Sequence, residues 1–276
     1  MSGAAPSEDR QPVMDHVALA SRHAWDQVIR YCYHLGAHWL GGPPMAELGG
    51  FYFCQAGLDG GAKLEFLEPL DLPGSDFVRR FLDRNGPGPH HFTFKVPHFD
   101  AALEAVGAAG YTVVGVDRTD PQWNEAFLHP KESHGVVIQL AWDGNPDDEW
   151  PPPPELPPAR RDRPPTLRAV HHLVADLDAA VALFTGPLAM TEVERTEGPR
   201  GREAVVACGP WRLELAQPGD DGSRRHWLGT RPGRLHHLTL AIEEPAAVPD
   251  ARPLGDGRYE IPPEANLGTR LILEAR

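Results

Sequence analysis

Cysteine is rare in this sequence, which contains only Cys32, Cys54 and Cys208 and no CxxC pair. An odd number of widely spaced cysteines suits neither a disulfide framework nor a thiolate metal site. We therefore expect all three to be buried free thiols without a catalytic role.

Long apolar runs are also missing. No stretch approaches the roughly 20 apolar residues that a membrane-spanning helix requires. The first residues, MSGAAPSEDRQP, lack the basic segment and apolar core of a secretory signal. We therefore expect a cytoplasmic protein that does not enter a membrane, and we expect residues 1–12 to be disordered because they are small, polar and charged.

Basic residues are outnumbered, with 26 Lys and Arg against 39 Asp and Glu and a formal net charge of −13. Binding to a nucleic-acid backbone requires a basic face, so a nucleic-acid partner is excluded. Apolar residues make up 41% of the 276 residues, which is enough for one large core or two ordinary ones. The composition indicates a soluble globular protein.

Proline is concentrated near the middle of the chain, where residues 143–166 contain nine prolines among 24 residues. Such a segment forms neither a helix nor a central strand. We interpret residues 144–166 as a stiff, extended linker. It separates a first domain, residues 13–143, from a second domain, residues 167–276.

Four strand-like motifs occur twice, in the same order on both sides of the linker. The last pair aligns only after a one-residue shift behind its glycine. The pairs are MDHVALA (14–20) with VHHLVAD (170–176), KLEFLEP (63–69) with RLELAQP (212–218), HHFTF (90–94) with HHLTL (236–240), and GVVIQLA (135–141) with TRLILEA (269–275).

Helical spacing of apolar residues marks residues 23–36, 99–111 and 176–188, and each of these segments ends near a glycine. The last quarter carries prolines where its helix should lie, so we expect a shortened final module. The order of elements is β-α-β-β-β, repeated four times, which predicts an α+β protein.

The alternation of apolar and polar residues assigns two faces to every strand. The face opposite the helices carries His16, Glu65, His91 and Gln139 in the first half, and His172, Glu214, His237 and Glu274 in the second. The histidines that precede ligand candidates (His90, His171 and His236) are expected on the helix side. An alternative is that these polar residues simply form the solvent-facing side of an antiparallel sheet.

The motifs DHVALA, KLEFLEP, GPGPHHFTF and AFLHPKESHGVVIQL (126–140) resemble the vicinal oxygen chelate superfamily, which includes glyoxalases, bleomycin resistance proteins and extradiol dioxygenases. Residues 13–142 resemble its methylmalonyl-CoA epimerases in particular. Residues 167–276 resemble the superfamily only, through HHL, RLEL and LHHLTL. The resemblance implies tandem domains in which four modules form two cupped, antiparallel-rich sheets.

It also implies one divalent metal ion (Zn, Co, Ni, Fe or Mn) in each active domain, held in the first domain by His16, Glu65, His91 and Gln139. The epimerases place glutamine on the second ligand strand and glutamate on the fourth, and this sequence exchanges the two. Two imidazoles, a carboxylate and an amide oxygen are suitable ligands for such a metal and leave room for two substrate oxygens.

The remaining site residues follow from the same resemblance. Glu47 and Glu65 are candidate catalytic residues, with Glu47 as the base that removes a proton. Lys131 and Ser133 lie in the HPKESHG loop and are candidates for contacts with an acyl group. A plain loop glutamate and a turn-forming sequence explain these residues equally well.

The activity implied is that of a metal-dependent epimerase or isomerase, which removes a proton next to a metal-chelated carbonyl of a small acyl thioester or hydroxy ketone. Two alternatives stay open. One is an Fe(II) ring-cleaving dioxygenase of the extradiol type that uses His172, His237 and Glu274, and the other is a metal-free drug-sequestering resistance protein. The second domain either binds a second metal or serves as a lid or pseudo-dimer partner, in a monomer or a homodimer.

Overall fold

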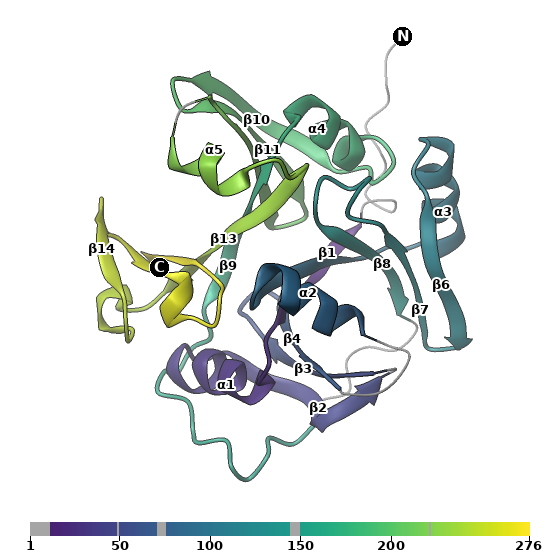
Figure 1. The fold of residues 1–276 in the computed structure, drawn as a ribbon. Helices are drawn as coiled ribbons and strands as arrows, with labels where there is room; N and C mark the ends of the chain where they lie inside the picture. The colour runs from purple at the N-terminus through teal and green to yellow at the C-terminus, as the bar shows by residue number, and fades with distance from the viewer. Residues whose placement is uncertain (1–11, 49, 71–75, 144–149, 221) are drawn as a thin grey trace. The chain divides into compact units, whose positions relative to one another are not determined.

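The computed structural model describes residues 12–48, 50–70, 76–143, 150–220 and 222–276, and it contains two eight-stranded sheets (Figure 1). The first has the order β2-β3-β4-β1-β5-β8-β7-β6. Its strands are β1 (Val13–Ala20), β2 (His38–Leu48), β3 (Phe51–Gly57), β4 (Lys63–Pro69), β5 (Gly88–Lys95), β6 (Val113–Asp120), β7 (Trp123–Leu128) and β8 (Val137–Asp143). The helices of this half are α1 (Ala24–Val28), continued by the π-helix η2 (Ile29–His34), α2 (Phe77–Asn85) and α3 (Phe99–Ala108).

The second sheet repeats this arrangement, with the order β10-β11-β12-β9-β13-β16-β15-β14. Its strands are β9 (Thr166–Val174), β10 (Thr191–Gly198), β11 (Gly201–Cys208), β12 (Trp211–Pro218), β13 (Gly233–Ile242), β14 (Arg252–Gly255), β15 (Arg258–Ile261) and β16 (Leu271–Ala275). Its helices are α4 (Leu177–Thr185), α5 (Ser223–Leu228) and the 3-10 turns η3 (Pro245–Ala247) and η4 (Pro263–Ala265). None of the helices in the described ranges combines the length and apolar character needed to cross a membrane.

These elements confirm the predicted α+β class and the fourfold β-α-β-β-β order. The shortened last module is also confirmed, because η3 replaces its helix and β14 and β15 have only four residues each. Two helices, α2 and α5, occupy segments in which the sequence analysis predicted no helix. In α2, Val78 and Leu82 are buried against Ala18 and Leu67 of the sheet, so a short amphipathic pattern was overlooked.

The two faces of β1 and β4 follow the predicted alternation. Val17, Leu19, Leu64 and Phe66 are fully buried. The strands are parallel, and Ala18 pairs with Glu65. Residues two apart on a strand share a face, so His16 and Glu65 lie on the same side of the sheet.

Contacts between Cα atoms divide the chain into two compact units, and each combines segments from both sides of the linker. One comprises Met1–Asp15, Phe92–Asn145 and Ala169–His236, and the other His16–His91, Pro146–Arg168 and His237–Arg276. The predicted domains 13–143 and 167–276 follow the two sheets rather than these units. That division stays a prediction.

The part of the linker that the structure describes, from Trp150 onward, contains no helix or regular strand before Thr166, as predicted. It is nevertheless attached within its own unit. The backbone N–H of Trp150 donates to the carbonyl of Leu40 (3.0 Å), and that of Arg160 donates to the carbonyl of Tyr33 (2.9 Å). The Arg160 guanidinium also lies 5.1 Å from the centre of the Tyr33 ring.

A buried polar network connects η2 to the end of the chain. The side-chain oxygen of Asn266 accepts from Arg30 Nε (2.9 Å), and its amide donates to the Tyr31 hydroxyl (3.0 Å) and to the Thr269 carbonyl (2.7 Å). Arg30 also lies 3.5 Å from a carboxylate oxygen of Asp250. Burial raises the pKa of Tyr31 to about 12, because the phenolate would lose its hydration.

Cys32 and Cys54 are buried free thiols, as predicted. Burial raises the pKa of Cys32 to about 12 and also raises the pKa of Cys54. The Cys208 side chain lies outside the described residues.

We expect these groups to make the fold sensitive to alkali. The folded-state pKa values of Tyr31 and Cys32 lie above those of the unfolded chain, about 10 and about 8.5, so the unfolded chain loses these protons first. Stability is therefore fully present below about pH 8.5 and falls as pH rises toward 12. Urea denaturation at pH 8 and pH 11 measures how much the free energy of unfolding decreases between these pH values. The decrease should be smaller in Tyr31→Phe than in the parent, and in the control Tyr259→Phe it should equal that of the parent. Equal losses in the parent and Tyr31→Phe would contradict the assignment.

Candidate metal site and its relatives

Three side chains of the first sheet converge on one point. His16 comes from β1, Glu65 from β4 and His91 from β5. The two Nε2 atoms are 3.4 Å apart, and Glu65 Oε2 lies 3.5 Å from that of His16 and 3.6 Å from that of His91. Only 2%, 9% and 6% of His16, Glu65 and His91 is exposed.

The dimensions of this triangle suit a transition metal. A point equidistant from three atoms at these separations lies about 2.0 Å from each, close to the usual Zn–N and Zn–O distances of about 2.0–2.2 Å. Two imidazoles and a carboxylate are also the ligand types that Zn, Co, Ni, Fe and Mn accept. The three residues could therefore hold a divalent metal.

Neighbouring side chains orient two of these ligands. Gln55, which pairs with Glu65 in the β3–β4 register, donates from Nε2 to Glu65 Oε1 at 3.3 Å. The Nδ1 atoms of His91 and His90 lie 2.8 Å apart. Burial lowers the pKa of His90 to about 4, so its ring is neutral at ordinary pH.

Gln139, the predicted fourth ligand, lies on β8, which neighbours β5 in the sheet order. Its side-chain oxygen accepts from the Thr93 hydroxyl (2.5 Å), and its amide nitrogen donates to Glu125 Oε2 (2.7 Å). These two contacts fix which end of the amide is oxygen. An amide oxygen has two lone pairs, so the contact with Thr93 leaves capacity for one more partner.

The sequence reasoning missed Glu125. Its carboxylate accepts from Gln139 and also from Trp123 Nε1 at 2.9 Å. The strand-like alternation of WNEAFL was the available signal, since it places Trp123 and Glu125 on one face. The exchange of Glu and Gln between the second and fourth ligand strands is thus accompanied by a further carboxylate on β7.

The other residues predicted for the first half have different settings. Glu47 lies on β2 and pairs with Tyr52 in the register, but its side chain lies outside the described residues. Ser133 is fully buried, and its hydroxyl contacts the carbonyls of His129 (3.0 Å) and Val136 (2.5 Å), which places it within the turn. Lys131 is exposed.

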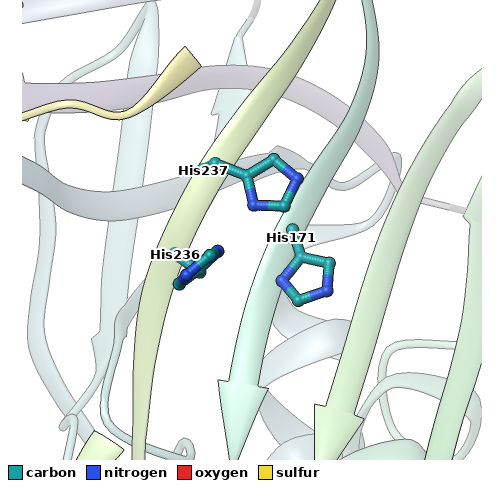
Figure 2. Close-up of side chains that lie close together, drawn as sticks. All are labelled: His171, His236 and His237. Atoms are coloured by element: carbon teal, nitrogen blue, oxygen red, sulfur yellow. The ribbon is translucent and has the colours of Figure 1, made fainter. Parts of the chain in front are cut away.

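In the second sheet the structure brings together three histidines, namely His171, His236 and His237 (Figure 2). Each offers a ring nitrogen within 4.8 Å of the others. The prediction had instead chosen His172 and had placed His171 and His236 on the helix side. Of the predicted second set, only His237 belongs to this group.

The register explains the difference. Glu214 pairs with His171 rather than with His172, so His171 shares the face of Glu214. His172 is fully buried on the opposite face, where its Nε2 lies 2.7 Å from the His134 carbonyl oxygen. Burial lowers the pKa of His172 to about 4.

The predicted alignment of VHHLVAD with MDHVALA is wrong by three residues, because it pairs His16 with His172. His23 and Asp176 are the N-cap residues of α1 and α4. The residue seven positions before each N-cap is His16 in the first half and Ala169 in the second, so Ala169 is the structural equivalent of His16. Glu274, the last predicted ligand, lies with its carboxylate 3.6 Å from Arg168 Nε.

Comparisons with known proteins agree with this architecture. Residues 15–127 match the family model of the glyoxalase/bleomycin resistance protein/dioxygenase superfamily, whereas no curated protein matches the chain. A mutant of 4-hydroxymandelate synthase from Streptomyces coelicolor has a TM-score of 0.66 and 15% identity over 97% of this chain and 94% of its own. A hypothetical protein from Staphylococcus aureus has a TM-score of 0.60 and 11% identity over 96% of this chain and 100% of its own.

Methylmalonyl-CoA epimerase from Mycobacterium tuberculosis has 25% identity over 48% of this chain and 89% of its own, with a TM-score of 0.43. The two full-length similarities establish the tandem fold and, at such identities, nothing about activity. The match to the glyoxalase/bleomycin resistance protein/dioxygenase superfamily model is confined to residues 15–127, within the first half of the chain.

Proposed function

We propose that the first half is a metal-dependent epimerase or isomerase. Its substrate is a small acyl thioester or hydroxy ketone, and the reaction removes and returns a proton on the carbon next to the carbonyl. The observation that supports this most is the triangle of His16 Nε2, His91 Nε2 and Glu65 Oε2, with sides of 3.4 to 3.6 Å. The match of residues 15–127 to the superfamily model and the resemblance of residues 13–142 to methylmalonyl-CoA epimerases supply the reaction class.

In this proposal His16, Glu65 and His91 hold the metal, with Gln139 as a fourth ligand. The metal, when bound, polarises the substrate carbonyl and so acidifies the neighbouring C–H bond. The hydrogen bond from Gln55 to Glu65 Oε1 orients the carboxylate, so that its Oε2 atom faces the two imidazoles. Such partners of metal ligands normally improve affinity by fixing ligand geometry.

Glu47 is the proposed proton acceptor. Its strand, β2, is hydrogen-bonded to β3, which also carries Gln55. A carboxylate can remove a proton from an acidified carbon without unusual basicity, particularly when substrate binding excludes water and raises the pKa of the carboxyl group. The carboxylate of Glu65 is assigned to the metal.

Deuterium exchange from solvent tests the reaction without knowledge of the natural substrate. We expect the metal-loaded protein to exchange the proton next to the carbonyl in 2-methyl acyl thioesters or 2-hydroxy ketones. The exchange should disappear in His91→Ala. It should fall by about 100-fold or more in Glu47→Gln, which should still bind the metal.

Oxygen consumption with catechols under Fe(II), measured in parallel, tests the dioxygenase alternative. Oxygen uptake without exchange, abolished in His237→Ala and retained in His91→Ala, would overturn the proposal in favour of the second half. A protein that purifies without metal, takes up none and still binds ligands would instead favour drug sequestration.

A further inference from the structure

We infer that His90 is a positioning residue for the metal site, because it accepts a hydrogen bond from Nδ1–H of His91 and thereby keeps Nε2 of His91 unprotonated. This inference rests on the proposed function, since it takes His16, Glu65 and His91 as the ligand set. It gives a role to the first histidine of the HH pair on β5, which the assignment of ligands had left unused.

The geometry between the two rings carries the first step. Their Nδ1 atoms lie 2.8 Å apart, a distance at which one nitrogen must carry a proton and the other must present a lone pair. Only two arrangements of neutral rings satisfy this condition. Either His91 donates to His90, or His90 donates to His91.

The two arrangements differ in what Nε2 of His91 can do. If His91 donates from Nδ1, its Nε2 carries a lone pair directed toward His16 Nε2 (3.4 Å) and Glu65 Oε2 (3.6 Å). If His90 donates, the single proton of neutral His91 sits on Nε2, and this nitrogen cannot bind a metal. Only the first arrangement is compatible with a metal inside the triangle.

The surroundings of His90 hold its ring in place. The ring packs against Phe81 in a T-shaped contact, with centroids 4.7 Å apart at 80°, and against Phe77, with centroids 5.7 Å apart. Both phenylalanines belong to α2, so this helix, which the sequence did not predict, packs against the ring. The fixed ring leaves its Nδ1 atom facing His91.

A purely structural role for His90 is the competing explanation, because an imidazole that packs against two phenylalanines also fills space. Two substitutions separate the roles. His90→Phe keeps an aromatic ring in the pocket but removes the acceptor nitrogen. His90→Gln has a smaller apolar surface but restores an oxygen that can accept from His91.

The test is the affinity for zinc alone, measured by competition with a chromophoric chelator at constant pH. We expect His90→Phe to bind zinc about 10- to 100-fold more weakly than the parent, the usual effect of losing such a partner. His90→Gln should stay within about threefold of the parent. The control His98→Phe replaces an exposed histidine before α3 and should bind as the parent does.

Long-range ¹H–¹⁵N spectra of the zinc-loaded parent give a readout that packing alone would not produce, and they need no variant. They should show His91 bound through Nε2 and protonated at Nδ1. Parental affinity in His90→Phe, or a His91 ring bound through Nδ1, would overturn the role of His90 while leaving the metal site intact. If the parent binds no zinc, both this inference and the proposed function fail.

Discussion

Replacing His91 or Glu65 by alanine should reduce the affinity for zinc or cobalt by well over 100-fold. Each variant loses one of the three ligands of the triangle, whereas losing a partner behind a ligand already costs about 10- to 100-fold. Metal content per chain after dialysis, measured by mass spectrometry, should fall from about one equivalent to near zero. Isothermal titration with Co(II) gives the corresponding affinities.

The control for these variants is His98→Ala. His98 is exposed and precedes α3, so its loss removes an imidazole without touching the triangle. If His91→Ala and Glu65→Ala both retain the metal of the parent, the metal lies elsewhere. Retention in these two variants combined with loss in His171→Ala would assign it to the three histidines of the second sheet.

Replacing Asn266 by alanine should lower the free energy of unfolding by about 3 kcal/mol or more. Its side chain is fully buried and makes three hydrogen bonds, to Arg30, Tyr31 and Thr269. The substitution removes an acceptor from the buried Arg30 guanidinium, which keeps Asp250 and the Pro249 carbonyl, and removes a donor from the buried Tyr31 hydroxyl. Loss of a partner from a buried polar group costs more than the hydrogen bond alone. Urea denaturation of the metal-free protein measures the change.

A matched substitution, Asn85→Ala, sets the scale for this measurement. Asn85 makes a single hydrogen bond, from Nδ2 to the Phe81 carbonyl at 3.0 Å, and its loss should cost about 1 kcal/mol. Equal effects of the two substitutions would mean that the Arg30 network contributes nothing beyond one ordinary hydrogen bond.

The fold was accessible from the sequence because its signals are local and repeated. Strand alternation, helix spacing and the order of motifs each occur several times, so the errors in individual segments do not change the architecture. The same alternation placed His16 and Glu65 on one face correctly, because β1 contains a single histidine and Glu65 is the glutamate in the middle of β4.

The second half shows where such reasoning stops. In β9 the two neighbouring histidines are equally good matches by residue type, and only the pairing of Glu214 with His171 decides between them. A shift of one residue moves a side chain to the other face of a sheet. Strand register depends on contacts between distant segments, so periodicity within one strand could not supply it.

Long-range polar contacts were similarly out of reach. Nothing in the local sequence around η2 indicates that Arg30 is paired with Asn266, and the partners of Gln139 depend on the packing of three strands. The sequence identified which residue types were available, and tertiary structure decided which of them meet.

The separation of Arg30 and Asn266 by 236 residues has a consequence for biosynthesis. At translation rates of about 5–20 residues per second, Arg30 is synthesised roughly 10–50 s before Asn266. During this interval the nascent chain carries a cation that it cannot bury at low cost. Chains that terminate at Ala265 would retain every strand of the first sheet and still lack Asn266. Such chains would carry Arg30 on η2 without the acceptor that Asn266 supplies.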